Sequence, residues 1–108
     1  NGDGNKTGII KYAENTGAVI GWGNLGGIAG VNNSKGTIEN AVNQGSVTSN
    51  VNDSTGFGGI SGINKGTIKD VVNEGDVKIY KEGTMGGNSV GGISGNNMLL
   101  IKALSLAA

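Results

Sequence analysis

The chain has 108 residues and a mass of 10.7 kDa, the size of one domain or of a segment of a longer chain. Glycine supplies 23 residues, apolar residues are 35 %, and Pro, Cys, His and Arg are absent. Without Cys and His, the usual zinc, haem and iron–sulfur sites, disulfides and Cys- or His-based catalysis are excluded, and we expect no metal or cofactor. Eight lysines balance eight acidic residues and no basic face stands out along the sequence, so nucleic acid is not an expected partner.

In chain order, the sequence consists of copies of one unit of about 32 residues, which predicts a repeat architecture. Residues 1–97 form this repeat region: a partial copy at 8–25, full copies at 26–57 and 58–90, and the start of another at 91.

The copies begin with Gly-Gly-Ile at Gly26, Gly58 and Gly91, at a nearly constant spacing. We interpret Asn33-Ser34 as a two-residue insertion in the first full copy. The same residue types recur at fixed places in the copies: Gly27, Ile28, Gly30, Ile38, Asn43, Gly45 and Val47, then Gly59, Ile60, Gly62, Ile68, Asn73, Gly75 and Val77, then Gly92, Ile93 and Gly95. In the partial copy, Ile10, Asn15, Gly17 and Val19 fall at equivalent places.

One repeat predicts short strands and turns. Residues 37–42 and 46–48 carry β-branched residues typical of strands, and the turn between them places Asn and Gly where positive φ is needed. No stretch before residue 97 shows helical spacing. Such a unit cannot bury its own apolar face, but stacked units can. We therefore expect an all-β fold, a β-solenoid of the right-handed, parallel β-helix type; a β-sandwich is the alternative.

At these positions the sequence resembles the bacterial GLUG repeat family, whose units carry Gly-Gly-aliphatic-x-Gly-x-Asn, then Gly-x-Ile-x-Asn and a Gly-x-Val ending. The match covers about residues 8–97. The chain departs from it at Ala41-Val42 and Val71-Val72, where members often have Cys-Tyr, and at Tyr12 and Asp70, where they have Asn. Such repeats occur in IgA-specific metallopeptidases and in large surface adhesins.

The resemblance implies a non-catalytic repeat segment of a secreted or cell-surface bacterial protein, which acts as a spacer or as an adhesive surface for a host glycan or protein. The alternative is the accessory repeat region of an extracellular peptidase, such as an IgA-specific metallopeptidase, or of a polysaccharide-cleaving β-helix enzyme. The carboxylates of Asp70, Glu74 and Asp76 are the densest acidic group, but lysines lie near them, and we expect them to be solvated side chains rather than catalytic ones.

Two features bear on binding. Asn15, Asn43 and Asn73 recur at one turn, which favours stacked amides that hydrogen-bond between coils, with an exposed glycan-binding row as the other interpretation. Trp22 and Phe57 lie near Gly-Gly-Ile starts and are the candidates for a binding surface, although core filling or end-capping would also use them.

The segment 98–108 departs from the composition before it. It is too short to span a membrane, so we expect no membrane insertion. A helical end cap with Asn97 as its N-cap and an abnormal chain end are the two interpretations, although Ile101 and Lys102 also fall one repeat length after Ile68 and Lys69. Open solenoid ends expose strand edges, so we also expect self-association.

Overall fold

The computed structural model describes residues 1–49, 56–79, 89–97 and 100–102, and in these ranges the chain is all-β. No helix in them could cross a membrane. The strands of these ranges are β1 (Gly8–Lys11), β2 (Glu14–Asn15), β3 (Val19–Gly21), β4 (Leu25–Gly26), β5 (Ala29–Asn32), β6 (Gly36–Glu39), β7 (Val42–Asn43), β8 (Val47–Ser49), β9 (Gly56–Gly58), β10 (Ser61–Asn64), β11 (Thr67–Lys69), β12 (Val72–Asn73), β13 (Val77–Ile79), β14 (Ser89–Gly91), β15 (Ser94–Asn97) and β16 (Leu100–Lys102).

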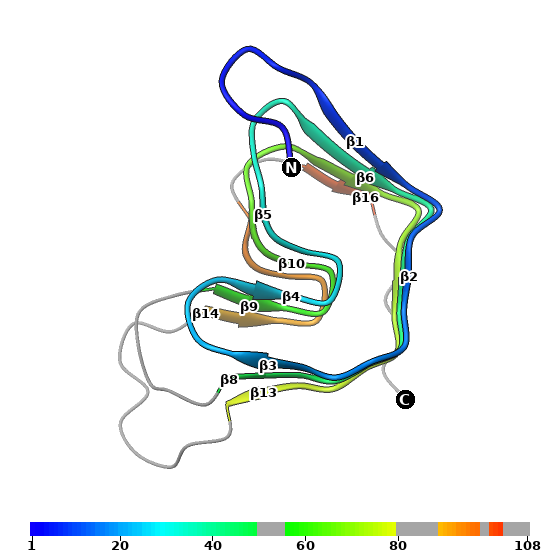
Figure 1. The fold of residues 1–108 in the computed structure, drawn as a ribbon, viewed down its shortest axis with the longest axis vertical. Coiled ribbons are helices and arrows are strands. Elements are labelled where there is room, and N and C mark those ends of the chain that lie inside the picture. Colours follow the sequence, from blue (N-terminus) through cyan, green and yellow to red (C-terminus); the bar gives the residue numbers. More distant parts are fainter. Residues whose placement is uncertain (50–55, 80–88, 98–99, 103–108) are drawn as a thin grey trace.

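The chain runs through five strand positions and then returns to a place beside the first. Each such circuit is called a coil: coil 1 is β1–β5, coil 2 is β6–β10 and coil 3 is β11–β15. Equivalent strands pair, giving five separate sheets (Figure 1). Each sheet is named by its first strand: the β1 sheet (β1-β6-β11-β16), and the β2, β3, β4 and β5 sheets of three strands each.

Every named strand pair is parallel and in register between equivalent residues. Ile38 pairs with Ile10 and Ile68, and the asparagines and valines aligned from the sequence also pair. This confirms the sequence alignment. A β-sandwich is built of antiparallel sheets, and the named strands form none, so the structure does not support that alternative. The arrangement, with several parallel sheets and no closed barrel, is consistent with the expected β-solenoid.

The spacing in sequence between paired residues differs around the circuit. In the β5 sheet, Ala29 and Ser61 lie farther apart in sequence than Ile10 and Ile38 do in the β1 sheet. The connection from β8 to β9 is longer than that from β3 to β4, and the connection from β5 to β6 contains the expected insertion Asn33-Ser34. Loops therefore absorb the differences in repeat length, and the strands stay in register.

The apolar core lies between the β1 sheet, the β2 sheet and the turns that join β4 to β5 and β9 to β10. Its fully buried members come from coils 2 and 3, and further apolar side chains pack against them. They are Ile38, Ala41, Ile60, Ile68 and Val71, with Ile10, Ala13, Ile28, Ala29 and Ile93 around them. Each coil thus places one isoleucine of a Gly-Gly-Ile segment in a common core, as stacked repeats require.

The Gly-Gly-Ile turns need glycine because they point toward the β2 sheet (Figure 1). A Cβ on Gly27 would overlap the side chain of Asn43, and a Cβ on Gly59 would overlap that of Asn73. The recurring glycine and the recurring asparagine of the motif therefore contact each other across the coil, and the small glycine leaves space for the amide.

The corner between the β1 and β2 sheets has left-handed backbone conformation. Its residues are Tyr12, Asn40 and Asp70, with φ of 60°, 53° and 53°. Asn and Asp are the non-glycine residues that enter this region most readily, which explains their place in the motif. Tyr12 occupies the same corner in coil 1, where its exposed ring lies 5.1 Å from the Lys11 ammonium group.

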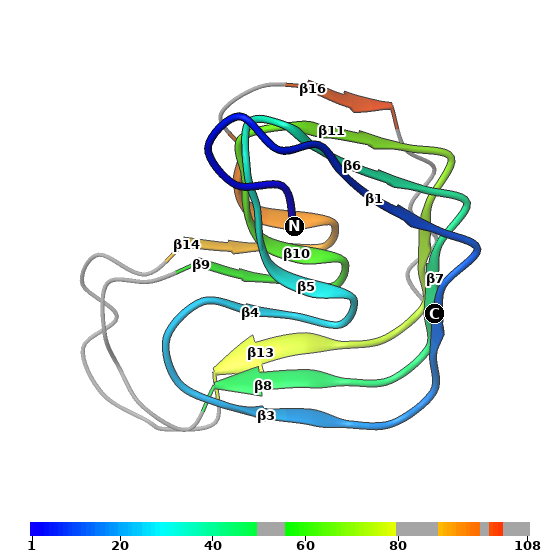
Figure 2. The ribbon, with the colours of Figure 1, turned by 45° about the horizontal axis from the view of Figure 1, so that its top comes forward.

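The interpretation of 98–108 as a helical cap is wrong for residues 100–102. They form β16, which pairs with β11 so that Ile101 lies in register with Ile68 (Figure 2). The reason is that β11 offers a free strand edge, and a β-branched residue at 101 favours a strand. The rest of this segment lies outside the described residues.

Candidate functional site

The recurring turn asparagines form a ladder of amides through the three coils. Nδ2 of Asn15 donates to Oδ1 of Asn43 at 2.9 Å, and Nδ2 of Asn43 donates to Oδ1 of Asn73 at 2.9 Å. The expected hydrogen bonding between coils is thereby confirmed. Both of these amides donate toward the later coil, so the ladder has a direction.

Each of these asparagines also closes its own turn. Nδ2 of Asn43 donates to the carbonyl of Gly45 at 2.8 Å, and Asn15 and Asn73 do the same with Gly17 and Gly75. One amide group therefore fixes both the turn within a coil and the contact between coils.

A second amide ladder runs along the β5 sheet. Nδ2 of Asn1 donates to Oδ1 of Asn32 at 3.0 Å, and Nδ2 of Asn32 donates to Oδ1 of Asn64 at 2.8 Å. The sequence-based predictions do not include this ladder. The signal for it is the Asn that ends the Gly-Gly-Ile-x-Gly-x-Asn motif, which recurs at Asn32 and Asn64 just as the first ladder's asparagines recur at their turn.

The interpretation of the first ladder as an exposed glycan-binding row is wrong for two of its three members. Asn43 is fully buried and Asn73 is 4 % exposed, and both use their amide hydrogens on protein oxygens. Asn15, in coil 1, is the partly accessible member. A buried amide must be hydrogen-bonded, and these contacts provide that.

The two aromatic candidates for a binding surface lie in different environments. Trp22, between β3 and β4, is 72 % exposed, whereas Phe57 in β9 is fully buried. Phe57 pairs with Leu25 in the β4 sheet and faces the interior, where it supplies apolar volume that neighbouring glycines lack. Phe57 is therefore not part of a binding surface, and of the two candidates only Trp22 remains accessible.

The three acidic candidates are exposed but not grouped. Asp70 lies at the corner before β12, and Glu74 and Asp76 follow that strand. Four residues of extended chain separate Asp70 from Glu74 by about 13 Å. Within the ranges that the structure describes, no group of three Asp or Glu side chains could hold a metal ion.

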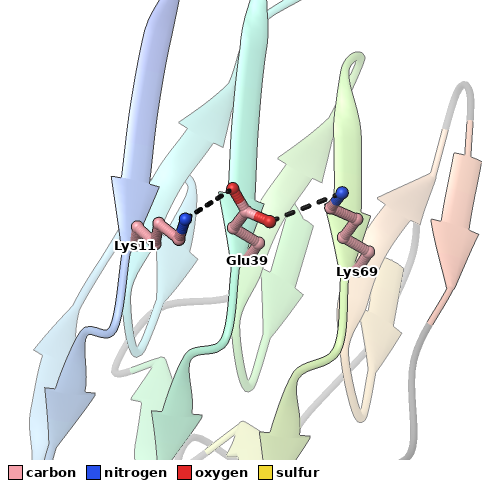
Figure 3. A network of polar contacts seen from close by, with 3 residues as sticks. All are labelled: Lys11, Glu39 and Lys69. Atoms are coloured by element: carbon pink, nitrogen blue, oxygen red, sulfur yellow. Dashed lines mark ion pairs between the residues drawn. The ribbon is translucent and has the colours of Figure 1, made fainter.

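The outer face of the β1 sheet carries a row of ion pairs. Glu39 lies between Lys11 and Lys69, with carboxylate–ammonium distances of 4.0 and 3.4 Å (Figure 3). The lysine side chains are 46 % and 44 % exposed and that of Glu39 is 18 % exposed. The row runs across three coils because the residues are in register.

The geometry thus offers two internal amide ladders, one charged outer face and one exposed tryptophan. Comparison of the chain with protein-family models, curated proteins and solved structures found no match.

Proposed function

We propose that this chain is a β-solenoid segment of the GLUG type, from a secreted or cell-surface bacterial protein, and that it serves as a non-catalytic spacer or adhesive surface. The observation that carries the proposal is the pair of amide ladders that tie equivalent residues of successive coils together. A repeat whose internal polar groups join one coil to the next can extend a stack by adding further coils.

The mechanism of the spacer is addition of coils. Neighbouring strands in a sheet lie about 4.8 Å apart, so each coil extends the stack by that distance. Between coils 1 and 2, and again between coils 2 and 3, strands of all five sheets pair, and each contact also carries links of buried amides. Separating two coils would expose all these groups together, which makes the stack stiff along its axis.

The adhesive role would use the outward side chains, which vary between coils while the inward ones repeat. In the β1 sheet, Ile10, Ile38 and Ile68 face inward, whereas the outward neighbours change from Lys11 to Glu39 to Lys69. A fixed frame with a variable flank can present a surface to a host glycan or protein without a change of fold.

Duplication of a coil tests the spacer. Residues 36–65 form one period of the β1 sheet, because Gly36 and Gly66 occupy equivalent places. Insertion of three further copies of 36–65 before Gly66 should add about 14 Å along the stacking direction, the 19 Å dimension of the particle (Figure 1), and small-angle X-ray scattering measures the resulting rise in the radius of gyration. The control carries the same inserted residues in shuffled order. An insert that leaves the radius of gyration unchanged, or that behaves like the shuffled control, would rule out the stacked-coil proposal.

The adhesive role is tested by an array of glycans and host surface proteins probed with the 108-residue chain. Binding of one ligand class above the others supports it. Silence across the array would leave the spacer role only.

A further inference from the structure

The lysines look scattered in the sequence, but the stacking of coils gathers them on the outer face of the β1 sheet. Lys35 and Lys65 are exposed residues of the turns that lead into β6 and β11, and Glu39 and Lys69 lie at the other ends of the same two strands. Lys11 is exposed as well. Stacking therefore brings together lysines that are distant from one another in the sequence.

These lysines form two rows that run along the stack, here called the lysine face (Lys11, Lys35, Lys65 and Lys69). Lys35 directly precedes Gly36 and Lys65 directly precedes Gly66, so the two lysines stand where neighbouring coils enter the β1 sheet. Lys69 lies four residues along the chain from Lys65, at most about 14 Å away. The backbone of Lys102 in β16 continues the row of Lys69.

Fewer acidic than basic side chains lie at the lysine face. Glu39 is shared between Lys11 and Lys69, and the exposed Asp70 follows Lys69 at the corner of the coil. Glu74 and Asp76 lie beyond the far end of β12, on another side of the coil. The neutral hydroxyls of Thr37 and Thr67 lie in register between the two rows. A chain of zero net charge thus carries a face with a local excess of positive charge.

We propose that the lysine face binds an anionic polysaccharide that lies along the stack. The proposal rests on the adhesive role proposed above and names its ligand class. Rows of compact ammonium groups at a repeated short spacing fit sulfate or carboxylate groups repeated along an extended polymer, and neutral Thr side chains leave room for uncharged parts of the sugar.

Nucleic acid fits the lysine face less well. The chain has no Arg to read phosphates or bases in bidentate fashion, and no aromatic residue of the described strands lies between the two rows to stack on bases. A second copy of the chain also fits less well, because the exposed acids of the described residues occupy no equivalent places in neighbouring coils and form no row along the stack; they are Asp3, Glu14, Asp70, Glu74 and Asp76.

The test measures binding of the 108-residue chain to dextran sulfate and to polygalacturonate, with uncharged dextran as the reference, by isothermal titration calorimetry. We expect binding to the anionic polymers that weakens as salt rises, because exposed charges are screened, and no binding to dextran. The double variant Lys35→Gln, Lys65→Gln should lose about tenfold or more in affinity for dextran sulfate. Glu39→Gln should gain a few-fold, since it removes the opposing charge.

The matched control is Lys78→Gln. Lys78 is exposed like the others but lies in β13, away from the β1 sheet, and its removal changes the net charge by the same step per residue. It should leave the affinity unchanged, and thermal melts should show that all variants remain folded. If Lys78→Gln lost as much affinity for dextran sulfate as the lysine-face variant loses for each lysine removed, the proposal would be overturned.

Two further outcomes would also overturn it. Tighter binding of single-stranded oligothymidylate than of dextran sulfate would assign the lysine face to nucleic acid. Concentration-dependent association that Lys35→Gln, Lys65→Gln abolishes would assign the face to a second copy. Failure of this proposal can be told apart from failure of the proposed function. Binding of only uncharged ligands on the array would keep the adhesive role without an anionic ligand, and an extended stack after coil duplication would keep the spacer role.

Discussion

At the scale of single residues, Asn43 joins its own turn to the coils on both sides. Its amide donates to Gly45 and to Asn73 and accepts from Asn15. The substitution Asn43→Leu should therefore lower the free energy of unfolding by about 2–4 kcal/mol, because several buried polar groups lose their partners at once. Urea denaturation followed by circular dichroism measures this.

Asn15→Leu is the matched control for that prediction. Asn15 occupies the same place in coil 1, is only half-buried and lies in the first coil of the ladder. Its replacement should cost clearly less than that of Asn43. Equal losses at the two positions would show that closing the turn, rather than the ladder, holds the coils.

The left-handed corner gives a second prediction. Asn40 has φ of 53°, so Asn40→Ala should destabilise the protein by about 1 kcal/mol, whereas Asn40→Gly should be close to neutral because glycine enters this region without strain. Thermal melts of the two variants decide it. If both variants lose the same stability, the side chain of Asn40 rather than its backbone conformation is what matters.

The residue scale also shows where sequence reasoning succeeds and where it stops. The recurring asparagines and glycines can be predicted to serve turns and stacking, but the positive φ expected in the turn from Asn43 to Gly45 is wrong. Gly45 is needed there because a Cβ would overlap the neighbouring coil. The burial of Phe57 cannot be predicted. Whether a single aromatic residue faces the interior or the solvent is normally read from the alternation of apolar and polar residues around it. Phe57 lies between glycines, which show no such alternation.

At the scale of strands and turns, contact with the preceding coil makes glycine obligatory at Gly45 but not at the equivalent Gly17. A Cβ on Gly45 would overlap the carbonyl oxygen of Gly17, whereas a Cβ on Gly17 would meet its nearest atom, Oδ1 of Asn15, at 3.9 Å. Gly45→Ala should therefore destabilise the protein by about 3 kcal/mol or prevent folding, while Gly17→Ala should change stability by at most about 0.5 kcal/mol.

The pair is informative because both glycines occupy the same place in the motif. Soluble yield and urea midpoints of the two alanine variants provide the comparison. A tolerated Gly45→Ala would mean that neighbouring coils do not approach each other as the described register requires.

A fourth prediction concerns the packing of the β4 sheet. Phe57→Ala should lower the free energy of unfolding by about 3–5 kcal/mol, as expected for a buried phenylalanine, and Trp22→Ala should lower it by less than about 1 kcal/mol, since Trp22 is exposed. Denaturant titrations of both variants test this. A mild loss for Phe57→Ala would return that ring to the candidates for a surface.

The elements also explain why repeat boundaries and residues 100–102 are harder to predict than the repeat itself. Paired strands of the β1 sheet follow one another at shorter intervals in the sequence than those of the β5 sheet, because loops of unequal length lie between them. Leu100 and Lys102 lack the glycines of the motif, yet the free edge of β11 still pairs with them. Composition alone favours a helix there, and strand pairing with a neighbouring coil outweighs it.

At the scale of the whole molecule, charge shows most clearly what the fold adds. The net charge of zero and the spread of lysines along the chain suggest no charged surface. The lysine face forms because coils stack in a fixed register and outward positions of equivalent strands fall beside one another. To predict this face, one must first know the register in which equivalent strands pair. That register is set by the inward isoleucines and asparagines and not by the lysines.

The first edge of the stack leads to the last prediction. Among the named strands, β1 to β5 of coil 1 each pair on one side only, and unpaired strand edges favour association. Residues 1–6 cover a small part of this edge, where the amide of Asn1 continues the ladder above Asn32 and its α-amino group donates to the carbonyl of Val31 at 2.8 Å. We therefore expect the 108-residue chain to associate as its concentration rises. Sedimentation velocity at widely separated concentrations measures this.

Deletion of residues 1–6 sharpens the test. It uncovers the start of β1 and the acceptor end of the second amide ladder, so association should begin at lower protein concentration than in the full chain. Because the donors of both ladders point toward the later coil, copies that associate through this edge should stack in one direction, the last coil of one against the first of the next. A chain that remains monomeric over the whole range, and melts cooperatively at a temperature independent of concentration with or without residues 1–6, would refute association through this edge.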